Sequence, residues 1–468
     1  MRVVILKAVD LTVLPLLLLG LLVFQLDRMN LASALTAGFA RDIGINQTSV
    51  NLGNQLMFIG IIILEIPSNM LLQKIGPRIY IAAQVLVFGL IATLQCVVTN
   101  RTGFLIVKSL LGLAEAGYIP GGIFTISTWY TQKERAKRVA IFFFGMFGGN
   151  AISPLLASGI IKLDGKRGLR GWQWIFLLEG VFTIAVALLI LLFLPGSPEH
   201  PEPIFSKGLI KISASEGEIL QKRIASEFPQ RIYKSQHMKI TLYVVWKTVS
   251  NWRRWPHFIA TSLIFSTWSP LTTYTPSIIM SLGFSSVEAN ALASVGAFLV
   301  LPIVFIFAAI SDRTNKRGLT VFLAIIYYLI TLVVIRSTEA RVGKWGRWGL
   351  WTAVNTFAVG YQPVHNTWLQ LNCESPEERS VAIALFVMSS ITGLMYGTQY
   401  FQANDRPLYH NGLETMIGVV SAGAALVLVQ EFIYWKWNRK AIETAAPDNE
   451  DANSGNGKHG MFIPRKRQ

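Results

Sequence analysis

Long apolar segments, separated by short polar ones, recur along almost the whole chain. Crossing ~30 Å of hydrocarbon takes about 20 helical residues at 1.5 Å per residue. Twelve segments of about that length can be placed, and they predict an all-α integral membrane protein with twelve transmembrane helices in two six-helix bundles. The segments are residues 11–34, 51–72, 79–98, 103–129, 139–161, 172–194, 256–281, 288–310, 319–336, 346–369, 380–402 and 412–435.

A polar stretch at residues 196–255 interrupts this series after the sixth apolar segment. It starts with several prolines and contains many charges, which is typical of a loop between domains. We therefore expect an N-terminal six-helix bundle at residues 1–195, a cytoplasmic central loop at 196–255 and a C-terminal six-helix bundle at 256–440. Residues 441–468 lack periodicity and are predicted to be a disordered cytoplasmic tail.

Composition and charge support this topology. The 468 residues are 52% hydrophobic and 15% charged, whereas globular domains have about 25% charged residues. With a cytoplasmic N-terminus, the predicted inner segments carry 29 of the 42 Lys and Arg residues and the outer loops carry 11. Such an inside excess predicts that both termini are cytoplasmic. It also accounts for the net charge of +16 without a nucleic-acid partner.

Cofactor and metal chemistry find little support in the residues. Cys96 and Cys373 are the two cysteines of the chain, so the sequence has no disulfide framework and no cysteine-based metal site. A nucleotide-binding loop, a metal-spaced histidine set and a nucleophile constellation are also absent from the sequence. We therefore expect no cofactor and no metal, and a membrane-embedded enzyme is poorly supported.

Segments of the two predicted halves match each other at a constant spacing. Gln73 corresponds to Asp312, and Trp129 corresponds to Trp368, with the same offset (312 − 73 and 368 − 129, each 239). Parallel repeats of this kind are typical of transporters whose substrate site lies near the bilayer midplane, between two bundles that rock against each other.

Several motifs resemble a known family of transporters. Residues 312–317 (DRTNKR) are similar to the D-R-x-G-[RK]-[RK] loop of the major facilitator superfamily. Other motifs resemble the anion:cation symporter family and, within it, the fungal allantoate permease-like transporters. These motifs are residues 26–30 (LDRMN), 65–69 (EIPSN), 112–121 (GLAEAGYIPG), 129–130 (WY), 134–135 (ER) and 171–176 (GWQWIF). The resemblance covers residues 10–440, and it implies the superfamily fold and secondary active transport.

The resemblance also implies that the short loop after the second span and its repeat after the eighth take part in gating. The residues concerned are Gly76, Arg78, Asp312, Arg313, Lys316 and Arg317. In the first loop, Gln73 and Pro77 stand where the superfamily usually has an acidic and a basic residue. A charge cluster bracing that side is therefore expected to be weaker.

Charged residues within the predicted spans are few, and each costs about 2.5 to 3.5 kcal/mol at the middle of a span unless it is paired, hydrated or functional. Asp27 and Arg28 lie in the first span, and Lys108 and Glu115 lie in the fourth. Because Lys108 and Glu115 are seven residues apart, they lie on nearly the same helix face, ~10 Å apart along its axis.

The resemblance implies roles for these four residues. Arg28 would hold a substrate carboxylate together with Lys108, which replaces the more usual Arg by a point charge. Asp27 and Glu115 would take and release the proton. The alternatives are that Asp27 and Arg28 only pair within a packed bundle and that Lys108 snorkels to the outer surface. Glu65 and Glu179, in the second and sixth spans, are expected to brace helix ends and loops.

The C-terminal half offers polar and aromatic groups in place of charges. The seventh span contains Trp268 and Tyr274 within a polar, proline-interrupted stretch, and the tenth contains His365 and Asn366. Such spans are expected to line a cavity, so these four residues are predicted to bind substrate and shape selectivity. A lone histidine such as His365 can equally serve as a packing or hydrogen-bonding residue.

The sequence therefore predicts a secondary active transporter, a proton-coupled symporter of a small organic anion that works by alternating access. An exporter of a drug or secondary metabolite on the same fold stays open, as does a sensor on a transporter scaffold. Asn46 and Asn100 head two N-x-[ST] sequons in predicted outer loops and are candidate glycosylation sites. We expect a monomer in the lipid bilayer, with the plasma membrane as its location by family resemblance.

Overall fold

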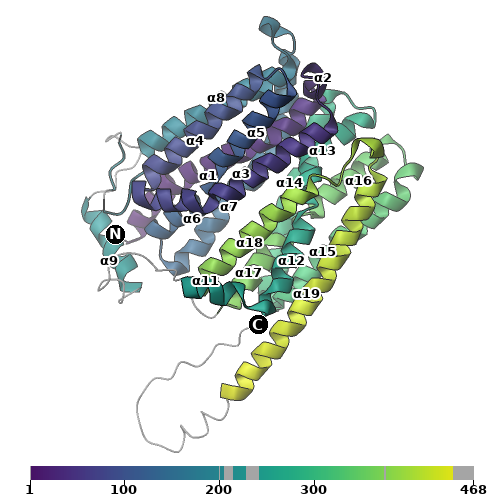
Figure 1. The fold of residues 1–468 in the computed structure, drawn as a ribbon. Coiled ribbons are helices and arrows are strands. Elements are labelled where there is room, and N and C mark those ends of the chain that lie inside the picture. Colours follow the sequence, from purple (N-terminus) through teal and green to yellow (C-terminus); the bar gives the residue numbers. More distant parts are fainter. Residues whose placement is uncertain (1, 200, 205–213, 228–241, 374–375, 446–468) are drawn as a thin grey trace, which may run out of the picture. The chain divides into compact units, whose positions relative to one another are not determined.

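The structure is a computed structural model that describes residues 2–199, 201–204, 214–227, 242–373 and 376–445. Within these ranges it is helical and contains no β-strand (Figure 1). The residues form two compact units, which are described separately. Unit 1 comprises residues 1–237, 270–298 and 401–409, and unit 2 comprises 238–269, 299–400 and 410–468.

The helices of unit 1 form a bundle in which α1 packs against α7 and α8, α4 packs against α8, and α3 packs against α5. The complete helices of unit 1 are α1 (Arg2–Thr36), α2 (Phe39–Asp42), α3 (Gln47–Ile75), α4 (Pro77–Leu94), α5 (Arg101–Glu115), α6 (Tyr118–Trp129), α7 (Gln132–Ile160), α8 (Gly171–Phe193) and α9 (Ala214–Glu227). Short 3₁₀ turns are η1 (Gln95–Val97), η2 (Ile161–Leu163), η3 (Lys166–Gly168) and η6 (Ala403–Asp405).

Unit 2 is built around α12, which packs against α18 and α19, and α15, which packs against α16 and α19. Its helices are α11 (Leu242–Val249), α12 (Trp255–Phe265), α15 (Arg317–Thr338), α16 (Lys344–Phe357), α17 (Gln362–Leu371), α18 (Pro376–Gly397) and α19 (His410–Ala445), with turns η4 (Trp252–Arg254) and η5 (Glu339–Arg341). Two helices, α13 (Trp268–Ser281) and α14 (Ser286–Thr314), have residues in both units.

Ten helices of the described residues are long and apolar enough to cross a membrane, and they match ten of the twelve predicted spans. Of these ten, the one that matches the predicted span 103–129 consists of α5 and α6 in succession. The predicted spans 256–281 and 346–369 are each divided into two shorter helices. In the first of these, α12 ends where the hydroxyl groups of Ser266 and Thr267 bond to backbone carbonyls of the preceding turn. Helix α19 continues to Ala445, so the predicted tail begins inside it, and residues 446–468 lie outside the described residues.

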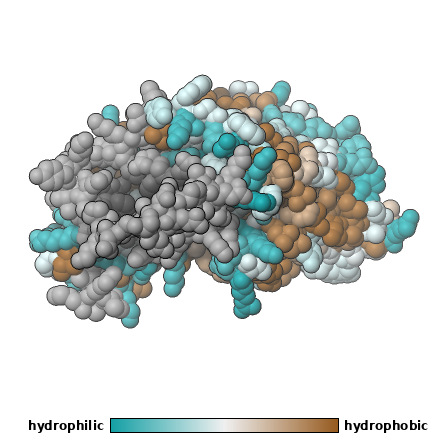
Figure 2. Space-filling view, turned by 90° about the horizontal axis from the view of Figure 1, so that it is seen from below, coloured by the Kyte–Doolittle hydropathy of each residue, from teal (hydrophilic) through white to brown (hydrophobic). Residues whose placement is uncertain are grey.

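Side chains on the flanks of these helices are apolar and exposed, as expected for helices that face lipid. On α3, for example, Ile63 and Ile66 are 61% and 63% exposed. Figure 2 shows apolar side chains gathered in patches between polar ones on the face that it presents. The buried positions hold most of the polar and charged groups of the spans, which is where the candidate site is built.

Glycines allow the closest helix contacts. A Cβ added to Gly112 of α5 would overlap the backbone of Met57 on α3, and one added to Gly397 of α18 would overlap the backbone of Ser266 beyond α12. Small residues at such positions let membrane helices approach backbone to backbone. The α3–α5 contact in turn fixes how α5 presents Lys108 and Glu115 to the interior of unit 1.

Candidate functional site

An ion pair between α1 and α5 joins two of the predicted residues. The Arg28 guanidinium donates from Nε to Oε2 of Glu115 at 2.7 Å. The Glu115 side chain is fully buried, and that of Arg28 is 16% exposed. One helical turn before Arg28, the ring of Phe24 lies under the guanidinium, 4.2 Å from ring centroid to Cζ. This contact adds cation–π attraction and holds the guanidinium in place.

Lys108 and Glu115 both point into the interior of unit 1, as their spacing predicts. Lys108 is 0% exposed, so it does not snorkel to a surface, and its Nζ has no hydrogen-bond partner among the described residues. It faces the opposite charges of Glu115 and Asp27 and the like charge of Arg28. A buried ammonium group without a hydrogen bond is energetically costly, which is a feature of functional sites in membranes.

Asp27 points away from the Arg28–Glu115 pair toward α8. Its carboxylate accepts a hydrogen bond from the Thr183 hydroxyl at 3.2 Å, and the side chain is 0% exposed. The carboxyl group of Glu179, one turn before Thr183 on α8, lies beside the Asn30 amide. Asp27 and Arg28 do not pair with each other in this structure. Arg28 bonds to Glu115 on α5, and Asp27 bonds to Thr183 on α8.

Sequence reasoning missed the part played by Asn30 and Thr183. Asn30 follows Asp27 by three residues and Thr183 follows Glu179 by four, so each pair shares a helix face. These spacings could have identified Asn30 and Thr183 from the sequence as neighbours of the two acidic residues. Glu65 has the bracing position expected of it, because its Oε2 accepts the Gly117 N–H at 2.8 Å, where α5 ends and α6 begins. Glu179 instead lies beside Asn30, in the last two turns of α1.

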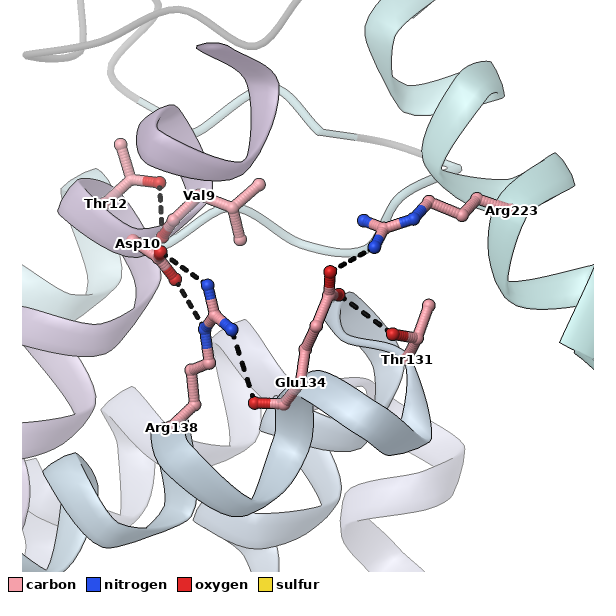
Figure 3. Close-up of polar contacts among 7 residues, drawn as sticks. All are labelled: Val9, Asp10, Thr12, Thr131, Glu134, Arg138 and Arg223. Carbon is pink, nitrogen blue, oxygen red and sulfur yellow. Dashed lines mark hydrogen bonds and ion pairs between the residues drawn. The ribbon is translucent and has the colours of Figure 1, made fainter. Parts of the chain in front are cut away.

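A second group of charges lies at the end of unit 1 where the chain begins (Figure 3). Arg138 of α7 donates to both carboxylate oxygens of Asp10 on α1, at 3.0 and 2.7 Å, and to the backbone oxygen of Glu134 at 3.3 Å. The Glu134 carboxylate accepts from Thr131 at 2.9 Å and pairs with Arg223. This group therefore ties α9, from the central loop, to α7 and α1.

The hydrogen bonds of Glu134 govern its charge. Although partial burial favours the neutral carboxyl group, the bonds from Arg223 and Thr131 outweigh it and lower the pKa of Glu134 below its ordinary value. Glu134 is thus ionised at neutral pH, as the ion pair requires.

The rest of α9 and the start of the central loop also pack on unit 1. Arg78, one of the predicted gating residues, donates to the backbone oxygen of Glu202 at 3.0 Å. Gly217 lies so close to Pro198 that a Cβ would come within 2.5 Å of its carbonyl oxygen, and Leu220 is buried. Gly76 has a φ of 92°, which favours glycine, and it forms the turn between α3 and α4.

The repeat of this loop in unit 2 lies between α14 and α15. Arg317 pairs with Asp312 at 3.5 Å, and the Asp312 side chain is 73% exposed. An ion pair this exposed contributes at most about 1 kcal/mol. Arg313 and Lys316 belong to the same turn, in which Asn315 has a φ of 53°.

At the other end of unit 1, polar residues of α3 contact the segments 270–298 and 401–409. Gln47 donates to the Phe401 carbonyl at 2.9 Å and accepts from Arg406 at 2.6 Å. Asn51 donates to the same carbonyl at 3.1 Å and accepts from Tyr274. These bonds join α3 to both segments, and the predicted substrate-binding residue Tyr274 takes part in them.

The other predicted residues of the C-terminal half lie in unit 2. The His365 ring is stacked on His257 of α12, with centroids 3.7 Å apart, and shares a hydrogen bond with Thr261 at 3.1 Å. Asn366 accepts from Gln370 at 3.3 Å, and Trp268 is 7% exposed. His365 is thus a packed, hydrogen-bonded residue in this structure, which is the alternative that the sequence left open. His257 was not among the predicted residues.

Both sequon asparagines are exposed N-cap residues. Asn46 accepts from the Ser49 N–H at 2.9 Å at the start of α3, and Asn100 accepts from the Gly103 N–H at 2.8 Å at the start of α5. Each bond satisfies a backbone donor of a first helical turn. Glycosylation of either residue stays a prediction.

Apolar helices long enough to cross a membrane, with charged side chains buried among them, define the class of helical membrane transporters. Residues 17–398 match the family model of the Major Facilitator Superfamily, so the chain belongs to this superfamily. It is therefore a multi-pass membrane transporter of a small molecule and not an enzyme.

Curated relatives share this assignment. An uncharacterized transporter of Saccharomyces cerevisiae is 26% identical over 89% of this chain and 77% of its own length. An MFS-type transporter of Penicillium expansum, cnsO, is 28% identical over 93% of this chain and 83% of its own. A protein of Agrobacterium vitis whose name assigns it to tartrate transport is 29% identical over 67% of this chain and 66% of its own.

Solved structures confirm the fold. An inward-facing bacterial homologue of the human lysosomal transporter Spinster is similar with a TM-score of 0.67 at 16% identity, over 91% of this chain and 97% of that one. The xylose transporter XylE of E. coli, in a partially occluded inward-open conformation, is similar with a TM-score of 0.65 at 15% identity, over 91% and 96%. At these identities the likeness supports the fold alone.

Proposed function

We propose that the chain is a proton-coupled symporter of a small organic anion, of the allantoate permease-like kind. The observation that carries the proposal is the Arg28–Glu115 ion pair at 2.7 Å, buried within a helical bundle beside Asp27 and Lys108. A guanidinium group in a protected site recognises a carboxylate through a planar, bidentate pair of hydrogen bonds. In the described structure Glu115 occupies that position.

The proposed coupling follows from competition for Arg28. Protonation of Glu115 removes its negative charge, so the attraction that holds the guanidinium is lost. Arg28 can then bind the substrate carboxylate, with Lys108 supplying a second positive charge. Release of the proton restores Glu115 as the stronger partner and expels the anion. Asp27, the residue before Arg28 on α1, is the second proton acceptor, and substrate and proton thereby move together.

Selectivity and gating are assigned to residues of both units. Trp268, Tyr274, His365 and Asn366 are proposed to contact the substrate at some stage of the cycle, when the helix breaks beside them change. Residues 76–78 and 312–317 are proposed to hold their ends of the units closed and open in turn. We place both termini in the cytoplasm and the chain in the plasma membrane, as a monomer.

One comparison supports an anion as cargo. The name of the Agrobacterium vitis relative refers to tartrate, a dicarboxylate. The buried basic residues of this chain fit a carboxylate, whereas a neutral sugar would leave them unpaired.

The test is uptake of a panel of radiolabelled organic acids into cells that express the chain, at acidic and at neutral external pH. We expect acid-stimulated uptake of at least one acid, its loss with a protonophore, and its loss in Arg28→Ala and Glu115→Gln. Glu218→Gln, an exposed acidic position on α9, is the control that should leave uptake unchanged. Exclusion of a compound by wild-type cells, with its retention by the two variants, would instead establish the exporter.

A further inference from the structure

The charged cluster of unit 1, defined as Asp27, Arg28, Lys108, Glu115 and Glu179, contains more acids than bases. All three carboxyl groups are almost fully buried, with exposures of 0 to 3%, and Lys108 is 0% exposed. Three carboxylates facing two cations would leave one net negative charge inside the bundle. Because an uncompensated charge in the membrane interior is costly, the cluster is stable when it holds one extra proton.

The contacts show which acids have a cation. Glu115 is bonded to Arg28 at 2.7 Å. Asp27 receives the Thr183 hydroxyl at 3.2 Å and faces the positive charge of Lys108, although Glu115 and Glu179 repel it. Both of these carboxyl groups therefore have a positive partner that favours the ionised form.

Glu179 has no such partner among the described residues. The Asn30 amide lies beside one of its carboxyl oxygens and beside the Leu26 carbonyl, and the amide orientation that satisfies both has the nitrogen donating to each, at 2.8 Å to Leu26. Oε1 of Glu179 has no hydrogen-bond partner in the described part of the chain. An ionised carboxylate would need several donors at this depth, whereas a neutral carboxylic acid needs fewer.

The helices packed on α8 bring no other compensating charge to Glu179. From α1 it faces Asn30 and Asp27, and Asp27 in turn faces Lys108 and Glu115 of α5. The charged residues of α4 and α7 lie in their first two turns, at position 78 and at 133–138. Lys162 of η2 lies near the opposite end of α7.

We propose that Glu179 carries a proton while the Arg28–Glu115 pair is formed, with Asn30 as its positioning residue. The proposal rests on the proposed function for its place in the cycle: Glu179 stores the proton that Glu115 and Asp27 exchange. When Glu115 is neutral and Arg28 holds the substrate anion, Asp27 and Glu179 exchange protons with solvent. Thr183 links the two, because its hydroxyl donates to Asp27 and lies one turn from Glu179.

The experiment reads the proton directly and needs no substrate. Infrared spectra of the purified full-length chain in detergent should contain, at neutral pH, the C=O stretching band of a buried protonated carboxylic acid. This band should shift on exchange into D₂O. We expect Glu179→Gln to remove it and Asp27→Asn to keep it. A band that persists in Glu179→Gln and disappears in Asp27→Asn would overturn the proposal, as would its absence from the wild type.

Further variants address two problems, a failure of Glu179→Gln to fold and a purely structural role of Glu179. If Glu179→Gln does not yield folded protein, Glu179→Asp keeps an acid, and its band should move in frequency; an unmoved band would count against Glu179. Asn30→Ala should move the band by removing its hydrogen bond, whereas Glu65→Gln, which alters a carboxyl group that caps α6, should leave it in place.

Transport separates this proposal from the proposed function. In proteoliposomes, Glu179→Gln should keep exchange of substrate at equal pH on both sides but lose accumulation driven by a pH gradient. If the wild type transports an anion without any dependence on the pH gradient, the proposed symport is wrong, and the infrared result still decides where the proton resides. If Glu179→Gln accumulates substrate as the wild type does, Glu179 does not carry the coupling proton.

Discussion

Arg28 balances the charge of Glu115, whose side chain is fully buried. Breaking a buried ion pair by removing one partner costs about 3 to 5 kcal/mol, whereas replacing both partners can be nearly neutral. The Arg28–Glu115 pair is therefore weak evidence that these residues serve to stabilise the fold. It is stronger evidence for a switch whose two states differ by one proton.

This asymmetry predicts how two variants differ. Arg28→Ala should lower the free energy of unfolding by about 3 kcal/mol, because Glu115 is left buried and unpaired. The double variant Arg28→Ala with Glu115→Gln should recover most of that loss. Neither should transport. Thermal unfolding in detergent, followed by tryptophan fluorescence, measures stability, and the uptake assay measures transport. Equal stability of the single and double variants would contradict a pair that is buried in the ground state.

The contact of α3 with α5 depends on the absence of a side chain at Gly112. Gly112→Ala should force the helices apart and destabilise unit 1 by about 1 to 3 kcal/mol, the usual cost of overpacking. Gly159→Ala on α7 is the matched control, because nothing lies within 4 Å of its added Cβ. The melting temperatures of the two variants in detergent check this. A Gly112→Ala protein as stable as the control would show that the close approach is dispensable.

Helix α9 should stay attached to α7 over a wide range of pH. Because the pKa of Glu134 in the folded chain lies below its ordinary value of 4.5, its ion pair contributes stability above pH 4.5, and this is lost as the pH falls through the lower folded value. A spin label on α9 at Ile219, which is 41% exposed, should therefore keep its mobility from neutral pH down to about 4.5 and gain mobility below it.

Two variants decide whether Glu134 is responsible. Glu134→Gln should give the mobile spectrum at every pH, because the charge that attracts Arg223 is gone. Glu218→Gln, which breaks only an exposed pair with Lys222 within α9, should behave as the wild type does. A label that loosens near neutral pH in the wild type would mean that another group controls the contact.

Hydropathy was sufficient to place the helices but not to divide them. The break between α12 and α13 lies inside a continuous apolar segment, where Ser266 and Thr267 satisfy backbone carbonyls, and mean hydropathy cannot detect such bonds. The same limit applies to the site. The Lys108–Glu115 spacing follows from helical periodicity, whereas the approach of Glu179 to Asn30 depends on how α1 and α8 rotate against each other.

Contacts between distant parts of the chain were the least accessible to sequence reasoning. Gln47 and Arg406 are 359 residues apart, and each lies in a short polar segment that could equally face solvent. The repeat at a spacing of 239 residues predicted two similar bundles and says nothing about which of their ends is closed. The bonds from α3 to the segment 401–409 emerged only from the three-dimensional structure.

In the proposed cycle of alternating access, we expect the bonds between α3 and the segment 401–409 to break, since a substrate must enter and leave at opposite ends. Cross-linking α3 to the segment 401–409 should therefore block transport. In a background with both Cys96→Ser and Cys373→Ser, Asn51→Cys combined with Phe401→Cys and treated with a short bifunctional thiol reagent should lose uptake, while each single-cysteine variant, treated alike, should keep it. The native contact makes the sites neighbours, because Asn51 donates to the Phe401 carbonyl at 3.1 Å. Cross-linking is checked by a mobility shift after cleavage of the central loop. Undiminished uptake by fully cross-linked protein would mean that α3 need not separate from the segment 401–409 during transport. The proposed rocking of the two bundles would then be wrong.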